Sequence, residues 1–182
     1  MSPGSILRSR LELKGKYIIT SVTLRLHKQP VINTSYGAIK ETLARRLADR
    51  DATPTIRDVS QAVIDIRQSK LPDPAKIGNA GSFFKNPVIP RSQYEALAGQ
   101  YENMPAYPVS EQEVKVPAGW LIERCGWKGK RIGSIGVHDR QALVLVNHGG
   151  GTGEELRKLA YQIKDSVARK FGINIEPEVN ML

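Results

Sequence analysis

The sequence is poor in several features, and each scarcity removes a class of protein or site. One cysteine, Cys125, stands among 182 residues, so no disulfide can form within the chain, and we expect a reducing compartment, the cytoplasm. Its apolar surroundings favour a buried structural thiol over a nucleophile. No apolar run approaches the length that spans a bilayer, and no secretory signal is expected. The histidines, His27, His138 and His148, are scattered, so we expect no metal site.

The charge balance is the second compositional constraint. The chain carries a formal net charge of +9 and has a pI near 9.8, which suits an anionic partner such as a nucleotide, an acidic metabolite or a nucleic acid. Aromatic residues make up 6% of the chain, and they do not alternate with basic residues as they do in RNA-recognition modules. We therefore interpret most basic residues as solvated faces and expect neither a nucleic-acid nor a membrane partner.

Apolar periodicity predicts helices and strands that do not alternate regularly along the chain. Helices are predicted at about 37–50, 55–70, 92–101, 118–125 and 152–171, and strands at 16–26, 132–137, 142–146 and 173–179. This mixture indicates an α+β fold, in which a small, mostly antiparallel sheet packs with several helices.

Local signals define where two of these helices begin. Thr55 is followed three residues later by Asp58, and Thr152 is followed three residues later by Glu155, so both threonines are predicted to cap exposed backbone amides. The glycines at 149–151 also precede a helix, but they lack the lysine and the spacing of a phosphate-binding loop. We interpret them as a turn.

The segment from Gly78 to Pro87, GNAGSFFKNP, is rich in glycine and in hydrogen-bond donors. It is typical either of a binding loop or of a turn whose polar groups satisfy its own backbone, and both readings stay open at this point. No nucleophile elbow surrounds Ser82, but a serine can act as a proton donor when a carboxylate or a cation tunes it. The polar residues that we single out are Tyr36, Lys70, Ser82, Lys85, Asn86, Gln141 and Glu178.

Three segments, in this order, carry a resemblance to a known family. They are KLPDPAKIGNAGSFFKNP at 70–87, PAGWLIERCGWKGKRIGSIGVHDRQALVLVN at 117–147, and IEPEVN at 175–180. From about Gly15 on, the chain resembles the UDP-N-acetylenolpyruvoylglucosamine reductase family, MurB. It matches the form in which a tyrosine-bearing segment, here around Tyr36, precedes the substrate domain.

The resemblance implies an oxidoreductase of peptidoglycan synthesis that makes UDP-N-acetylmuramate. In the family, NADPH reduces a bound FAD, the flavin passes hydride to UDP-N-acetylglucosamine enolpyruvate, and a serine protonates the adjacent carbon. By motif position that serine is Ser82, and Glu178 helps to stabilise the enol-like intermediate. The positions that match the family's contacts with the UDP-sugar are Tyr36, Lys70, Asn86 and Gln141, with Lys128 a less close match.

One departure from the family pattern limits what the resemblance implies. The family's N-terminal, FAD-binding half has no counterpart here, and its Tyr-Arg pair before the first strand is absent, so that arginine's role is assigned to no residue. We predict that residues 1–35 are a remnant of the flavin-binding domain and linker, and that 36–182 form the substrate-binding C-terminal domain. Because the cofactor carries the hydride chemistry, this chain alone is predicted to bind neither FAD nor NADPH and to be inactive.

Two further expectations follow from this departure. The alternative function is a free-standing module that binds UDP-sugars or another anionic ligand without redox chemistry. The strand at 16–26 would be left over from the flavin domain with an unpaired edge, and such edges favour self-association.

Overall fold

The computed structural model describes residues 20–35, 38–48 and 53–179. The chain divides into two compact units, Met1–Asn33 and Thr34–Leu182, and each is considered by itself. Every helix and strand described below belongs to the second unit.

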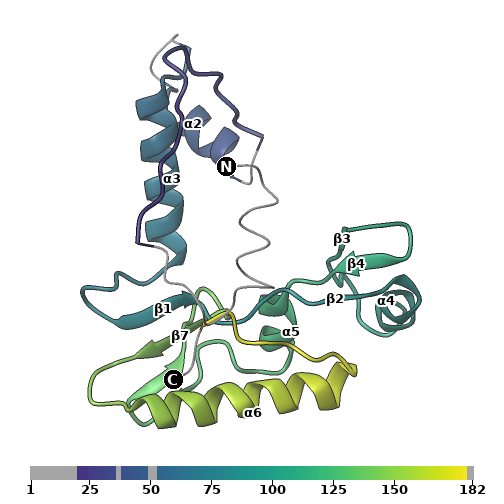
Figure 1. The fold of residues 1–182 in the computed structure, drawn as a ribbon. Coiled ribbons are helices and arrows are strands. Elements are labelled where there is room, and N and C mark those ends of the chain that lie inside the picture. The colour runs from purple at the N-terminus through teal and green to yellow at the C-terminus, as the bar shows by residue number, and fades with distance from the viewer. Residues whose placement is uncertain (1–19, 36–37, 49–52, 180–182) are drawn as a thin grey trace. The chain divides into compact units, whose positions relative to one another are not determined.

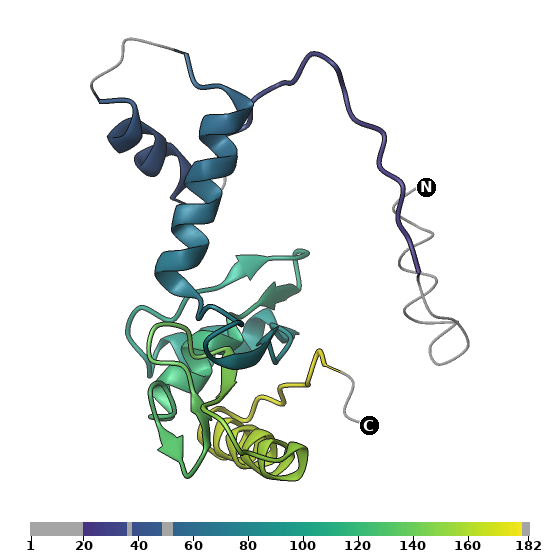
Figure 2. The ribbon, with the colours of Figure 1, turned by 90° about the vertical axis from the view of Figure 1, so that its left-hand side faces the viewer.

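The described residues of the first unit, 20–33, form neither a helix nor a strand (Figure 2). Val22, Leu24 and Leu26 are 68%, 73% and 81% exposed. The predicted strand at 16–26 is therefore wrong over residues 20–26, and its earlier part lies outside the described residues. Alternation of apolar and polar side chains stabilises a strand only when a neighbouring strand pairs with it and its apolar face is covered. The expected leftover strand, and with it the open edge proposed for self-association, is not formed there.

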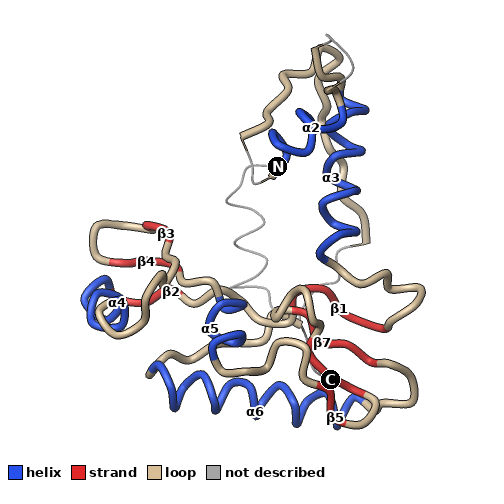
Figure 3. The backbone as a smooth tube through the Cα atoms, turned by 180° about the vertical axis from the view of Figure 1, so that it is seen from behind, coloured by secondary structure: helices blue, strands red, loops and turns tan. Residues whose placement is uncertain are grey.

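Five helices lie in the described part of the second unit, close to the predicted positions (Figures 1 and 3). They are α2 (Ile39–Arg46), α3 (Ile56–Lys70), α4 (Arg91–Ala98), α5 (Ala118–Arg124) and α6 (Gly153–Phe171). The α6 helix ends at Gly172, whose φ of 65° lies in the left-handed region that glycine adopts without steric cost.

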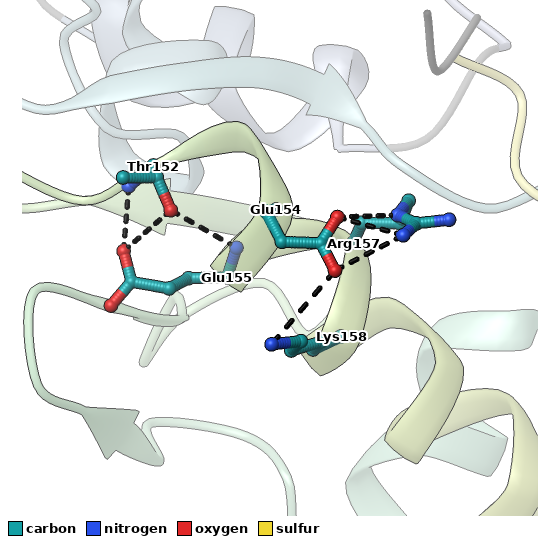
Figure 4. A network of polar contacts seen from close by, with 5 residues as sticks. All are labelled: Thr152, Glu154, Glu155, Arg157 and Lys158. Carbon is teal, nitrogen blue, oxygen red and sulfur yellow. Dashed lines mark hydrogen bonds and ion pairs between the residues drawn. The ribbon is translucent and has the colours of Figure 1, made fainter.

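The start of α6 shows why the capping signal identifies a helix (Figure 4). The backbone amide of Glu155 donates to the Thr152 hydroxyl at 3.2 Å, and the Thr152 backbone amide donates to the Glu155 carboxylate at 2.7 Å. In the same first turn, Glu154 pairs with Arg157 at 2.8 Å. The same reciprocal cap is present at Thr55 before α3, so the predictions made for both threonines are confirmed.

Two small antiparallel sheets complete the fold, and the predicted α+β class is confirmed. The first sheet has the order β1 (Gly78–Ser82), β7 (Val144–Asn147), β6 (Ile135–Val137), β5 (Arg131–Ile132). The second has the order β2 (Val88–Pro90), β4 (Glu113–Lys115), β3 (Tyr107–Pro108).

Several predicted strands need correction. The strand expected at 132–137 is a hairpin of β5 and β6, because Gly133 has a φ of 59° and turns the chain back on itself. The segment 173–179 forms no ladder, and its one bridge joins Pro177 to Phe84. The loop expected at 78–87 begins as strand β1. These elements depend on partners from distant parts of the chain, so local periodicity does not define them.

The main core packs α6 and α5 against the first sheet. Leu159, Ile163, Val167 and Phe171 of α6 are buried in it, together with Leu145 of β7. A second, smaller cluster holds α2 against α3 through Ile39, Leu43 and Ala62. Cys125 is partly buried at the edge of the main core, and burial raises the pKa of its thiol, which agrees with a structural role. Among the described helices, none has the length and apolarity needed to cross a membrane.

Candidate functional site

Ser82 stands at the end of β1, where the backbone passes from an edge strand into the core. Its neighbours Phe83 and Phe84 are 2% and 1% exposed, whereas Ser82 itself is exposed. The Phe83 amide donates at 2.8 Å to the carbonyl of Leu143, the residue before β7. Two buried aromatics and a backbone hydrogen bond therefore fix the backbone on which an exposed hydroxyl is carried.

The segment that carries Glu178 lies directly against the segment that carries Ser82. The Glu178 amide donates to the Phe83 carbonyl at 2.8 Å, and the Lys85 amide donates to the Glu176 carbonyl at 2.8 Å. Between them, Pro177 and Phe84 form an isolated antiparallel bridge. The fold thus pairs the two segments that carry Ser82 and Glu178, although they lie far apart in sequence.

Asn86 and Gln141 meet at the first turn of α5. The Asn86 carboxamide oxygen accepts from the backbone amide of Ala118 at 2.9 Å, so it satisfies a donor that the helix start leaves open. A methyl group built on Gly119 would lie 3.3 Å from the Gln141 side-chain oxygen, which puts Gln141 beside the same turn. The Gln141 side-chain oxygen accepts from the backbone amide of Leu143 at 3.4 Å. Both carboxamides thus accept through oxygen, and their NH₂ groups are donors.

Lys70 is the last residue of α3 and is exposed. The Arg140 guanidinium donates to the carbonyl of the adjacent Ser69 at 2.8 Å. This bond joins the end of α3 to the loop between β6 and β7, which also carries Gln141. Two of the proposed substrate contacts therefore come from segments that hold each other in place.

A cavity of about 780 Å³ opens between the end of α3 and the first sheet. Its lining includes Arg67, Lys76 and Arg140, one acidic residue, Asp73, and on β1 the residues Asn79 and Gly81. Cationic groups outnumber acidic ones, so the cavity favours an anion. The cavity reaches β1 at Gly81, the residue before Ser82, and its lining also includes Arg140, the residue before Gln141.

His138 also lines this cavity and is 7% exposed. Its Nδ1 accepts from the backbone amide of Arg140 at 3.3 Å, and burial lowers its pKa below the usual value. The lowered pKa favours the neutral imidazole, although Asp139, 3.4 Å from its Nε2, acts in the opposite direction. The positive charge among the lining residues comes from Arg67, Lys76 and Arg140.

Two of the residues predicted to contact substrate are not part of this arrangement as described. Lys128 lies beyond the far end of α5 from Asn86, where its ammonium pairs with Glu123 at 2.9 Å. Its proposed role stays a prediction. Tyr36 lies outside the described residues. Within the described ranges, no group of three or more metal-ligating side chains is found.

The comparisons with known proteins identify one family. A family profile described as UDP-N-acetylenolpyruvoylglucosamine reductase, C-terminal domain, matches residues 73–182. A UDP-N-acetylenolpyruvoylglucosamine reductase from Chromobacterium violaceum is 53% identical over 92% of this chain and 48% of the relative. A second, from Flavobacterium johnsoniae, is 53% identical over 94% of this chain and 50% of the relative. A third, from Amoebophilus asiaticus, is 52% identical over 98% of this chain and 51% of the relative.

The fold and the site together define an α+β domain with a serine and a glutamate on paired segments beside a cationic cavity. The chain belongs to the UDP-N-acetylenolpyruvoylglucosamine reductase family, a family of oxidoreductases, and it contains that family's C-terminal domain. It spans about half the length of the curated relatives it matches.

Sequence reasoning did not identify the cationic lining of the cavity. Arg67, Lys76 and Arg140 come from three separate segments, and only the fold shows that they converge. One local pattern could have pointed to this cavity. His138 is followed by the charged residues Asp139 and Arg140, and such a cluster in a loop is typical of a polar site.

Proposed function

We propose that this chain is the substrate-binding part of a UDP-N-acetylenolpyruvoylglucosamine reductase of peptidoglycan synthesis. In this role it holds UDP-N-acetylglucosamine enolpyruvate and supplies the proton donor, Ser82. The observation that carries the proposal is the hydrogen bond of 2.8 Å from the Glu178 amide to the Phe83 carbonyl, because Phe83 is the residue after Ser82. The name shared by the curated relatives supports the same reading.

The substrate carries a diphosphate and a carboxylate, and the described residues offer partners for both. The ammonium of Lys70 and the cationic lining of the cavity suit the anionic groups. The NH₂ groups of Asn86 and Gln141 are donors beside the start of α5, so they suit neutral or anionic oxygens. Tyr36 and Lys128 are proposed as further contacts.

The proton step uses residues of this chain. Ser82 would hold a proton at its Oγ and transfer it to the substrate carbon, and Glu178 would help to stabilise the enol-like intermediate. An exposed hydroxyl carried on a rigid backbone fits this task, because the acid must reach the substrate without moving the core. FAD reduced by NADPH would supply the hydride when bound, and we propose that the part of the relatives not spanned here holds it. In line with this division, we propose residues 1–35 as a remnant of the flavin-binding domain and linker, and 36–182 as the substrate-binding C-terminal domain.

The cellular setting of this activity is also a proposal. A single cysteine in the sequence suits a reducing compartment, so we propose a cytoplasmic protein. The reaction would contribute to cell-wall formation and, through it, to cell shape and cell division.

Calorimetric titration of the chain with UDP-N-acetylglucosamine enolpyruvate tests the binding role. We expect saturable binding without FAD, and no oxidation of NADPH. A hybrid protein, in which the N-terminal half of the Chromobacterium violaceum relative precedes this chain, should bind FAD and oxidise NADPH when the substrate is added. Binding without turnover in the hybrid would favour the alternative of a UDP-sugar binding module. If the chain and the hybrid both fail to bind the UDP-sugar, the proposed function is wrong.

The role of Ser82 is tested in the same hybrid by Ser82→Ala. Reduction of the flavin by NADPH should be unchanged, and reoxidation by the substrate should slow by roughly 10²- to 10⁴-fold, the usual contribution of a general acid. Stopped-flow absorbance separates the two half-reactions. Ser134→Ala, in the turn between β5 and β6, is the matched control and should leave both rates unchanged. Normal reoxidation in Ser82→Ala would remove Ser82 from the acid role.

A further inference from the structure

The pairing of β1 with β7 contains an irregularity just before Ser82. Asn79 lies opposite Val146, and Ser82 lies opposite Val144. Three steps along β1 therefore match two steps along β7, so β1 carries one extra residue. Such a bulge changes which face of the sheet every later side chain occupies.

The two faces of the first sheet differ in what they contact. Leu145 is buried in the core that contains α6, and Leu143 packs against the same core. The alternate residues, Val144 and Val146, are buried but are not part of that core. Residues directly opposite each other in an antiparallel pair share a face, so Ser82 lies on the face of Val144, away from α6.

Without the bulge, Ser82 would pair one residue further along β7, with Leu143. Its hydroxyl would then be directed toward the apolar core, and Phe83 would be directed out of it. In the observed register Phe83 is 2% exposed and packs in the core, while Ser82 is exposed. The bulge thus delivers the hydroxyl to the site and the aromatic ring to the core.

The side chain of Asn79 holds the bulge in place. Its Nδ2 donates to the Ile77 carbonyl at 3.0 Å, and its Oδ1 accepts from the Gly81 amide at 3.1 Å. Gly81 has a φ of 71°, which residues with a Cβ rarely adopt, and a Cβ built there would contact nothing within 4 Å. The Asn79 carboxamide therefore links the backbone at Ile77 to the backbone at Gly81, the residue with the left-handed conformation.

We propose that Asn79 is a positioning residue for the proton step: through the bulge at Gly81 it sets the face and the register of Ser82. This inference rests on the proposed function of Ser82 as the acid. Asn79 lines the cavity and acts through Ser82.

A double-mutant experiment in the hybrid protein tests this role. Asn79→Ala alone should slow flavin reoxidation by the substrate roughly 10- to 100-fold, as misplacement of a catalytic group by about 1 Å does. In the Ser82→Ala background the same substitution should change the rate less than about 2-fold, because no hydroxyl is left to position. Flavin reduction by NADPH should not change in either background.

Asn147→Ala is the matched control. Asn147 is also a half-buried asparagine on the paired strands, and it makes the same kind of turn bonds, accepting from Gly149 at 3.0 Å and donating to the Gly151 carbonyl at 2.7 Å. Its substitution should cost comparable stability, with no coupling to Ser82. Equal rate losses for Asn79→Ala in both backgrounds, or a rate loss for Asn147→Ala that also depends on Ser82, would overturn the proposal.

A second measurement uses the 182-residue chain without any cofactor. Amide hydrogen exchange at Phe83, whose amide is bonded to Leu143, should be at least about 10-fold faster in Asn79→Ala, whereas exchange at Val137, on β6, should not change. Unchanged exchange at Phe83 would contradict the positioning role.

If Asn79→Ala does not fold, Gly81→Ala tests the same bulge, because its cost is confined to the backbone angle. If Ser82→Ala does not change the rate of flavin reoxidation, the proposed acid role of Ser82 is wrong. The exchange at Phe83 then still decides, separately, whether Asn79 holds the register of β1 against β7.

Discussion

The helices α3 and α6 begin alike and pack differently. Each starts with a threonine that exchanges hydrogen bonds with an acidic residue three positions later. Yet α6 buries Leu159, Ala160, Ile163, Val167 and Phe171, whereas α3, which is 15 residues long, buries Ala62. The cap determines where a helix begins, and tertiary contacts determine how much stability depends on it.

The two helices also differ in what they contribute to the candidate site. The α6 helix supports the sheet that carries Ser82, and its apolar stripe has a defined partner. The α3 helix contributes its last residues, Arg67 and Lys70, to the site region, and its Ile56 is 62% exposed. One helix is therefore part of the scaffold, and the other is mainly a carrier of cationic side chains.

The largest difference between α6 and α3 is expected in the free energy of unfolding when one isoleucine in each helix is replaced by alanine. Ile163→Ala in α6 removes a side chain with 0% exposure and should lower the free energy of unfolding by about 2–5 kcal/mol. Ile64→Ala in α3 removes a side chain that is 41% exposed and should cost less than about 0.5 kcal/mol. Urea unfolding followed by tryptophan fluorescence measures both, because Trp120 and Trp127 report on the α6 core. Equal costs would show that the two helices are equally integrated.

A smaller difference between the two helices is expected in the stability lost when each N-cap threonine is replaced by alanine. Thr152→Ala should lower the global free energy of unfolding by about 1 kcal/mol, the usual value for a lost N-cap. Thr55→Ala should show its cost mainly as faster amide exchange in the first turn of α3, with the fluorescence transition little changed. Exchange and urea unfolding, measured on both variants, separate the two results. A shared shift of the global transition would mean that α3 and α6 unfold as one unit.

The smallest effect concerns pH. The Thr152 backbone amide donates to the Glu155 carboxylate, and this bond lowers the pKa of Glu155 below its usual value of 4.5. A carboxyl whose pKa is lowered on folding contributes stability above its unfolded pKa, and that stability is lost as the pH falls through the folded pKa. The melting temperature of Glu155→Gln should therefore fall less than that of the native chain between about pH 6 and about pH 3.

The control for this prediction is Glu102→Gln, at an exposed position outside the helices. It should show the native pH dependence of the melting temperature. If Glu155→Gln also followed the native curve, the cap at Thr152 would not contribute to the acid sensitivity of the fold.

The sequence predicted the helices well because their signals are local. Thr55 and Thr152 with their acidic partners, and apolar residues at helical spacing, lie within a few residues of each other. The strands were predicted less well, because β3 has two residues and pairs with β4, which is not defined by its own periodicity. The alternation over 16–26 is the clearest miss, since a strand needs a partner that alternation alone does not supply.

The motifs singled out Ser82, Asn86, Gln141 and Glu178, and their roles stay predictions. The fold places Ser82 at the end of β1 against the segment of Glu178, and it places Asn86 and Gln141 beside the start of α5. The bulge before Ser82 was not predictable, because it is a property of the register between β1 and β7. The cationic cavity was not predictable either, since its residues converge only in three dimensions.

The antiparallel contact between Phe83–Lys85 and Glu176–Glu178 has a consequence for the order of assembly. During synthesis, β1 leaves the ribosome long before residues 176–178 are made. The hydrogen bond from the Glu178 amide to the Phe83 carbonyl can therefore form only after that late segment has been synthesised. Contacts between such distant segments form late and slow the folding of a domain. A nascent chain would therefore carry its serine before its glutamate, and only a chain synthesised to Glu178 could place the two side by side.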